Sequence, residues 1–205
     1  MGLDTKARGP VGERRLVAGV VAPFVWLLGA LLVSWVERDF MDRLGWDVWP
    51  SGLALGPQGW LQVLVFLAFA AAMVVFAFAV RALTLPRLGR WGSRVLLVAA
   101  VITPLLAFRT DPPGDPVTWH GALHATGYVV LMLGLLASYV LLLPGILRRA
   151  RGRQWGWAAL ALLLVPPGFL MPTSTGTSGY LFFAVPFVPL AAAALMLRTR
   201  TAPVD

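Results

Sequence analysis

Long apolar runs without a charged side chain constrain this chain more than any other feature. Residues 16–36 and 60–80 contain no Asp, Glu, Lys or Arg. A helix needs about 20 mostly apolar residues to cross the hydrocarbon core of a membrane. The 205 residues include 59% hydrophobic and 13% charged side chains and no Cys, far from the composition of a soluble domain. The sequence therefore predicts an all-α polytopic membrane bundle and excludes a soluble, disordered or disulfide-stapled protein.

Four further segments complete a predicted set of six spans within one transmembrane domain, residues 1–205. The marginal segment is 92–108, because its uncharged part is short and contains Pro104. The flanking residues Arg94 and Arg109 have long side chains that can reach the membrane interface while their stems stay in lipid. The six predicted spans cover residues 16–36, 60–80, 92–108, 121–143, 155–171 and 180–197.

The distribution of charge predicts the orientation of the spans. Six crossings place 14 of the 17 Lys and Arg residues on one side and six of the nine Asp and Glu residues on the other. Because cytoplasmic loops collect Lys and Arg, both termini are predicted to be cytoplasmic. The basic excess is thus an orientation signal, and no nucleic-acid partner is expected. The inner arginine clusters could also contact anionic lipid headgroups.

Tryptophan positions and residue usage refine this prediction. Eight of the nine Trp residues fall near predicted interfaces, as in an aromatic belt, and Trp26 is the mid-span exception. Sixteen Arg residues against one Lys, with no Asn, suggest a GC-rich bacterial genome. We therefore expect a multi-pass protein of the bacterial inner (plasma) membrane.

The segment between the third and fourth spans is the richest in chemistry. His120 and His124 are four residues apart, so they share one face of a helix and could ligate a divalent metal together with Asp111. A metal held there could activate water; no other cofactor is expected. The alternative is structural, with a Pro-rich turn, Thr118 as the N-cap of the next helix, and Asp–His or Arg–Asp contacts. The candidate functional cluster consists of Arg109, Asp111, Asp115, His120, His124 and Tyr128.

Other polar and small residues near the spans have structural explanations. Ser34 and Thr103 can satisfy their hydroxyl groups on the backbone of their own helices. Gly127, Gly134 and Ala137 are typical of close helix contacts in membranes. The charged residues 37–43 are predicted to form a solvated charged face or a helix extension.

The outer segment also resembles a known family. Six short spans, a Phe-x-x-Asp-Pro turn and a His-Gly-x-Leu-His helix start are similar to the bacterial membrane proteins of domain of unknown function 998. The resemblance implies a six-helix integral membrane protein without an established activity, and it supports Asp111 and His124 as a pair. The residues that carry it are Phe108, Asp111, Pro112, His120, Gly121, Leu123 and His124.

Three functions follow as expectations. The first is a protein that binds membrane lipid or a partner membrane protein through its outer Asp/His cluster. The second is a metal-dependent intramembrane lipid hydrolase or transferase that uses Asp111, His120 and His124 as ligands. A small transporter ranks last, because no charged residue lies mid-span and no inverted repeat is visible.

Overall fold

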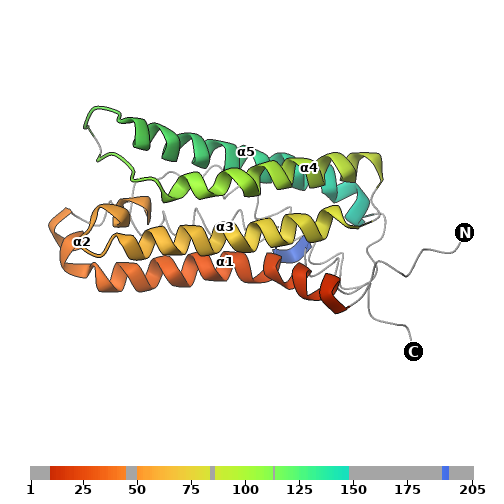
Figure 1. Ribbon diagram of the computed structural model, residues 1–205, viewed down its shortest axis with the longest axis horizontal. Helices are drawn as coiled ribbons and strands as arrows, with labels where there is room; N and C mark the ends of the chain where they lie inside the picture. Colours follow the sequence, from red (N-terminus) through yellow and green to blue (C-terminus); the bar gives the residue numbers. More distant parts are fainter. Residues whose placement is uncertain (1–9, 45–49, 84–85, 113, 148–190, 194–205) are drawn as a thin grey trace, which may run out of the picture.

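The computed structural model describes residues 10–44, 50–83, 86–112, 114–147 and 191–193, and within these residues all regular structure is helical (Figure 1). The long helices are α1 (Pro10–Val36), α3 (Trp60–Arg81), α4 (Arg87–Ile102) and α5 (Trp119–Leu147). The short ones are α2 (Arg38–Leu44) and the 3-10 helices η2 (Pro50–Leu55) and η3 (Thr103–Ala107).

Four helical segments in the described part are long and apolar enough to cross a membrane. They are Arg14–Val36, Trp60–Arg81, Arg87–Ala107 and Trp119–Gly145, which correspond to the first four predicted spans. The marginal segment 92–108 thus begins earlier than predicted, at Arg87. The predicted spans 155–171 and 180–197 lie outside the described residues, except for residues 191–193. The all-α membrane class is therefore confirmed, while the number six stays a prediction.

The four long helices run antiparallel to their neighbours in the chain (Figure 1). Helix α3 packs against both α1 and α4, and α4 packs against α5. Buried aromatic and Met side chains fill the centre, among them Trp26, Phe69, Met73 and Phe76. The short elements α2 and η2 lie at the end of the bundle where α5 begins.

Small residues set the distance between α4 and α5. A Cβ atom added at Gly134 would lie 2.6 Å from Cβ of Ala99. A Cβ atom at Gly127 would lie 2.7 Å from Cβ of Leu105. Helices approach this closely only where one side lacks a side chain. The predicted role of both glycines as helix contacts is confirmed, whereas the same prediction for Ala137 is wrong, since Ala137 is exposed.

Pro104 changes the geometry of the third span. Helix α4 ends at Ile102 and the chain continues as the 3-10 helix η3. Proline has no backbone N–H to donate, and its ring clashes with the carbonyl four residues earlier in an α-helix. The Thr103 hydroxyl donates to the Ala99 carbonyl at 2.8 Å, and that of Ser34 donates to Ala30 at 2.8 Å, as predicted.

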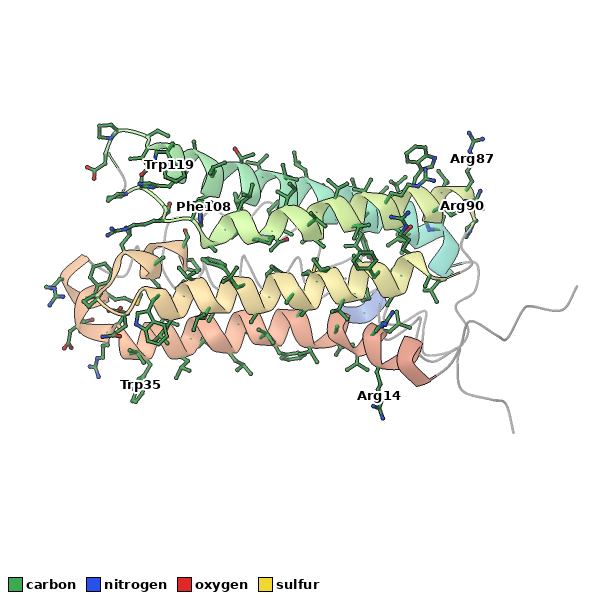
Figure 2. All side chains as sticks on the ribbon, in the orientation of Figure 1. Arg14, Trp35, Arg87, Arg90, Phe108 and Trp119 are labelled. Carbon is green, nitrogen blue, oxygen red and sulfur yellow. The ribbon has the colours of Figure 1, made fainter. Side chains whose placement is uncertain are left out.

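The two ends of the bundle differ in their side chains. Figure 2 shows Trp35 and Trp119 at one end, and Arg14, Arg87 and Arg90 at the opposite end. Between these ends, apolar side chains on the outside of α1 are exposed: Phe24, Leu28, Leu31 and Leu32. An uninterrupted apolar surface with aromatic residues at its boundary is typical of a helix in contact with lipid.

Residues 37–43 include the predicted helix extension, and the expected solvated charged face is wrong only at Glu37. Helix α2 does extend α1, and Arg38 and Asp42 form an exposed pair at 3.9 Å. Glu37, however, is only 3% exposed, and its carboxylate accepts a hydrogen bond from the backbone N–H of Gln58. The chain returns over Glu37 before α3 begins, with Gly56 against the carboxyl group. The backbone N–H of Gln58 replaces part of the hydration that the carboxylate loses on burial.

Candidate functional site

The segment between η3 and α5 builds the candidate site at the end of the bundle that Trp119 marks (Figure 2). Phe108 leaves the helix with extended backbone angles, φ −67° and ψ 144°. The chain then turns, with the backbone N–H of Asp115 donating to the Pro112 carbonyl at 3.2 Å. Gly114 has φ +90°, the only positive φ among the described residues, a conformation that suits glycine.

Asp111 is bound to the start of α5 through Thr118. One carboxylate oxygen accepts the Thr118 backbone N–H at 2.9 Å, and the other accepts its hydroxyl at 2.6 Å. These bonds favour the ionised form, so the hydroxyl and then the N–H of Thr118 lower the pKa of Asp111. A Cβ atom at Gly121 would overlap the carboxylate, so the absence of a side chain there makes room for Asp111.

Thr118 is also the N-cap of α5, as predicted. Its hydroxyl oxygen accepts the backbone N–H of Gly121 at 3.2 Å. The first N–H groups of a helix have no partner within the helix, and a Thr side chain supplies one. The same hydroxyl thus links the helix start to Asp111.

His120 binds the loop through its Nδ1 atom. This atom lies 2.7 Å from the Thr118 hydroxyl oxygen, 3.1 Å from the Arg109 carbonyl oxygen and 3.8 Å from a carboxylate oxygen of Asp111. The single hydrogen of the Thr118 hydroxyl is donated to Asp111. Since the remaining groups can only accept, Nδ1 of His120 is the donor.

His124 is more deeply placed and only 7% exposed. Its Nδ1 atom lies 3.0 Å from the Leu106 carbonyl oxygen and 2.9 Å from that of Phe108. A carbonyl oxygen cannot donate, so Nδ1 carries the hydrogen and Nε2 of the neutral ring is the acceptor. The Phe66 ring packs against the imidazole edge to face, with 5.9 Å between centroids.

The two histidines therefore bind the backbone at the end of η3 through their Nδ1 atoms. A metal ion could reach them only at Nε2. Within the ranges that the structure describes, no group of three or more His, Cys, Asp or Glu residues could hold a metal ion. Metal ligation by Asp111, His120 and His124 stays a prediction that metal analysis can test.

The other candidate residues are distributed around this core. Arg109 contributes its backbone carbonyl, while its side chain is exposed. The side chain of Asp115 is also exposed. Tyr128 lies one turn beyond His124, half-buried, on the wall of a cavity.

This cavity has a volume of about 330 Å³ and lies between α1, α3, η2, η3 and α5. Its walls are mainly apolar and include Trp26, Phe66, Phe69, Leu131 and Met132. Its polar lining consists of Ser51, Thr110, Asp111, His124 and Tyr128. Ligand sites are typically concave and apolar with a few polar groups, and this cavity has that composition, at the small end of their usual volumes.

Sequence reasoning missed the part of the cavity that comes from α1, η2 and α3. Trp26 stood out as the mid-span tryptophan, and it is 2% exposed on the cavity wall. Phe66 and Phe69 gave no signal, because an apolar residue in a span faces lipid or core with the same pattern. Ser51 gave none because it lies outside the predicted spans. Among the candidates, the cavity includes Asp111, His124 and Tyr128 but not His120, Arg109 or Asp115.

Comparison with known proteins adds one match. The sequence model of a family described as "Protein of unknown function (DUF998)" matches residues 16–198. No curated protein and no solved structure matches the chain.

Proposed function

Since the chain belongs to the DUF998 family, whose description assigns no function, we propose from its cavity that it binds a membrane lipid. We place it in the bacterial inner membrane with six crossings and both termini in the cytoplasm. In this orientation the cavity beside Asp111 and His124 lies near the outer surface.

The cavity is the observation that carries the proposal. A wall of Trp26, Phe66 and Phe69 suits a hydrocarbon chain, and the carboxylate and imidazole of Asp111 and His124 suit a polar group. An amphiphile satisfies both parts of such a lining, whereas a purely polar ligand satisfies only one. A concave pocket of about 330 Å³ also favours a lipid over the surface of a partner membrane protein.

The depth of the cavity supports the same ligand. Apart from Ser51 of η2, its polar residues come from the loop before α5 and from the first turns of that helix. Trp119 begins α5 and is exposed, as expected of a residue at the membrane interface. Lipid headgroups lie at this level of a membrane, so the polar residues of the cavity are at a depth that suits a lipid headgroup.

Photo-crosslinking tests the proposal. The protein in nanodiscs is irradiated with a lipid that carries a diazirine in its acyl chain, and labelled peptides are identified by mass spectrometry. We expect labels on the cavity-lining residues of α3 and α5. Ala125→Trp should remove them, because Ala125 lines the cavity and is itself exposed.

Ala122→Trp is the matched control, since Ala122 is exposed on the same helix and does not line the cavity. Labels spread evenly over the lipid-facing side chains, with no difference between the two variants, would contradict lipid binding in the cavity.

A metal-dependent lipid hydrolase or transferase is the second candidate. It is favoured by one observation, that Asp111 and His124 line the same cavity. Metal analysis of the purified protein tests it: one divalent ion per chain, lost in His124→Ala, would support this candidate. A parent protein that contains no metal as purified and binds none when incubated with Zn²⁺ would exclude metal ligation by Asp111, His120 and His124.

A further inference from the structure

We infer that the cavity selects an uncharged amphiphile with a terminal hydroxyl group, which donates its hydrogen to Nε2 of His124. This inference rests on the proposed lipid binding and specifies the chemical class of the lipid. It follows from the tautomer of His124, the charges around the cavity and the composition of its walls.

The hydrogen bonds of His124 determine what it offers to a ligand. Both partners of Nδ1 are carbonyl oxygens, those of Leu106 and Phe108, so Nδ1 carries the hydrogen. The second ring nitrogen, Nε2, then has a free lone pair and no hydrogen. Because His124 lines the cavity, a bound ligand meets an acceptor there rather than a donor.

The charges around the cavity exclude an anionic headgroup. None of the described lining residues is a lysine or an arginine, and Asp111 contributes a carboxylate. Both oxygens of this carboxylate accept hydrogen bonds from Thr118, which favours its ionised form. A phosphate or fatty-acid carboxylate would therefore meet a like charge and an imidazole acceptor, with no cation among the described lining residues to compensate its burial.

An ammonium headgroup fits less well than a hydroxyl. It has three hydrogens that need acceptors, and it loses much of its hydration in an apolar cavity. The Asp111 carboxylate attracts an ammonium, but each of its oxygens already accepts a hydrogen bond from Thr118, which leaves fewer acceptor positions for the three hydrogens. A hydroxyl needs one acceptor for its hydrogen, which Nε2 of His124 supplies, and its oxygen can accept from Ser51 or Thr110 at the cavity wall.

The cavity walls account for the rest of the ligand. Beyond His124 the lining continues along α5 through Leu131 and Met132, with Phe69 opposite on α3. A single hydrocarbon chain attached to the hydroxyl-bearing carbon would lie along this wall. Long-chain alcohols and acylglycerols have this construction.

Chain-matched competitors test the inference. In the crosslinking experiment, 1-tetradecanol, tetradecyl phosphate and tetradecylamine differ only in their headgroups. We expect the alcohol to displace the photoreactive lipid at about a tenfold lower concentration than the other two, the effect of one net hydrogen bond. Stronger displacement by the phosphate or the amine, equal displacement by all three, or none by any of them would overturn the inference.

These outcomes are separate from a failure of lipid binding. If the photoreactive lipid labels the cavity and the alcohol has no advantage, lipid binding stands and only the headgroup assignment fails. If the cavity is never labelled, the proposed function itself fails, and the hydroxyl inference falls with it.

Nitrogen NMR detects the predicted hydrogen bond between the ligand hydroxyl and Nε2 of His124 directly. The chain contains two histidines, so ¹⁵N-histidine labelling gives four ring signals, and His120→Ala leaves only those of His124. We expect 1-tetradecanol to shift the Nε2 signal of His124 in the direction of an accepted hydrogen bond, while Nδ1 stays protonated. An unchanged Nε2 signal at saturating alcohol would overturn the inference, even if His124→Ala does not fold.

The variants complete the test. His124→Ala should abolish the preference for the alcohol over the phosphate. Thr126→Val should keep it, because Thr126 is exposed on the same helix and does not line the cavity. A preference that survives in a folded His124→Ala protein would contradict the assigned role of Nε2.

Discussion

Two imidazole rings complete the hydrogen bonding at one helix end in this protein. The last carbonyl groups of a helix have no partner within it, and here those near the end of η3 accept from His120 and His124. The spacing of the histidines predicted a shared helix face and suggested a shared ligand. Their Nδ1 atoms instead bind the carbonyls of Arg109, Leu106 and Phe108, so only Nε2 is left for function.

Asp111 makes the stability of the protein depend on pH at the residue scale. Thr118 holds the pKa of Asp111 below its usual value of 3.8 in the folded state. The unfolded chain therefore binds the proton more tightly, and the stabilisation is fully present above pH about 4 and is lost as the pH falls through the folded pKa. We expect Asp111→Asn to unfold at a lower temperature than the parent at pH 7 and at pH 5, with the difference shrinking below pH 4.

Thermal unfolding in detergent, followed by tryptophan fluorescence, measures this difference. Asp115→Asn is the control, because Asp115 lies in the same loop with an exposed side chain. A difference in unfolding temperature between the parent and Asp111→Asn that stays constant down to pH 2 would show that the carboxylate charge does not contribute to stability.

At the scale of elements, the junction of α4 with η3 positions the carbonyls that the histidines bind. Pro104 made the third span marginal in the sequence, and in the structure the α-helix ends before it and the chain continues with 3-10 geometry. Which carbonyls this would leave facing α5 depends on how the two helices pack, and packing is not encoded in the local pattern. Gly127 against Leu105 is the contact that brings η3 and α5 together.

The α4–α5 contact gives a prediction at this scale. Gly134→Ala should destabilise the protein by about 1–3 kcal/mol, because the added methyl group meets Ala99 with no space to move into. Ala99→Gly in the same chain should recover part of this loss, since it removes the atom that is struck. The free energies of unfolding of the two single variants and of the double variant measure the coupling between positions 134 and 99.

If the effects of the two substitutions on the free energy of unfolding were strictly additive, Gly134 and Ala99 would not be in energetically significant contact. Ala137→Gly serves as a comparison for the cost of glycine in a helix, because Ala137 is exposed on α5.

At the scale of the whole molecule, the bundle has two chemically different ends. Trp35 and Trp119 lie at one end together with the loop of Asp111, and Arg14, Arg87 and Arg90 lie at the other (Figure 2). Since Lys and Arg collect on the cytoplasmic side, this polarity favours the predicted orientation, with the cavity towards the outside.

Cysteine labelling tests this orientation. The chain has no Cys, so Asp115→Cys and Arg90→Cys each introduce a single thiol at an exposed position. We expect an impermeant thiol reagent to label the cysteine at position 115 in intact cells, and that at position 90 only after the membrane is opened. Gly114 at the tip of the same loop is a poorer position for a cysteine, because its positive φ disfavours a side chain. Labelling of position 90 but not of position 115 in intact cells would show that the protein has the opposite orientation.

The sequence by itself determined the class of the protein, because crossing a membrane requires long apolar helices whatever their partners. It also determined local features, such as the Thr118 cap, the Pro104 interruption and the hydroxyl bonds of Ser34 and Thr103, since these involve residues within one turn of each other. Only the tertiary structure decided that Glu37 is buried and that Trp26 shares a cavity with Asp111 and His124. These relations join residues far apart in the chain, and an apolar helix presents nearly the same pattern to lipid, to a neighbouring helix and to a cavity.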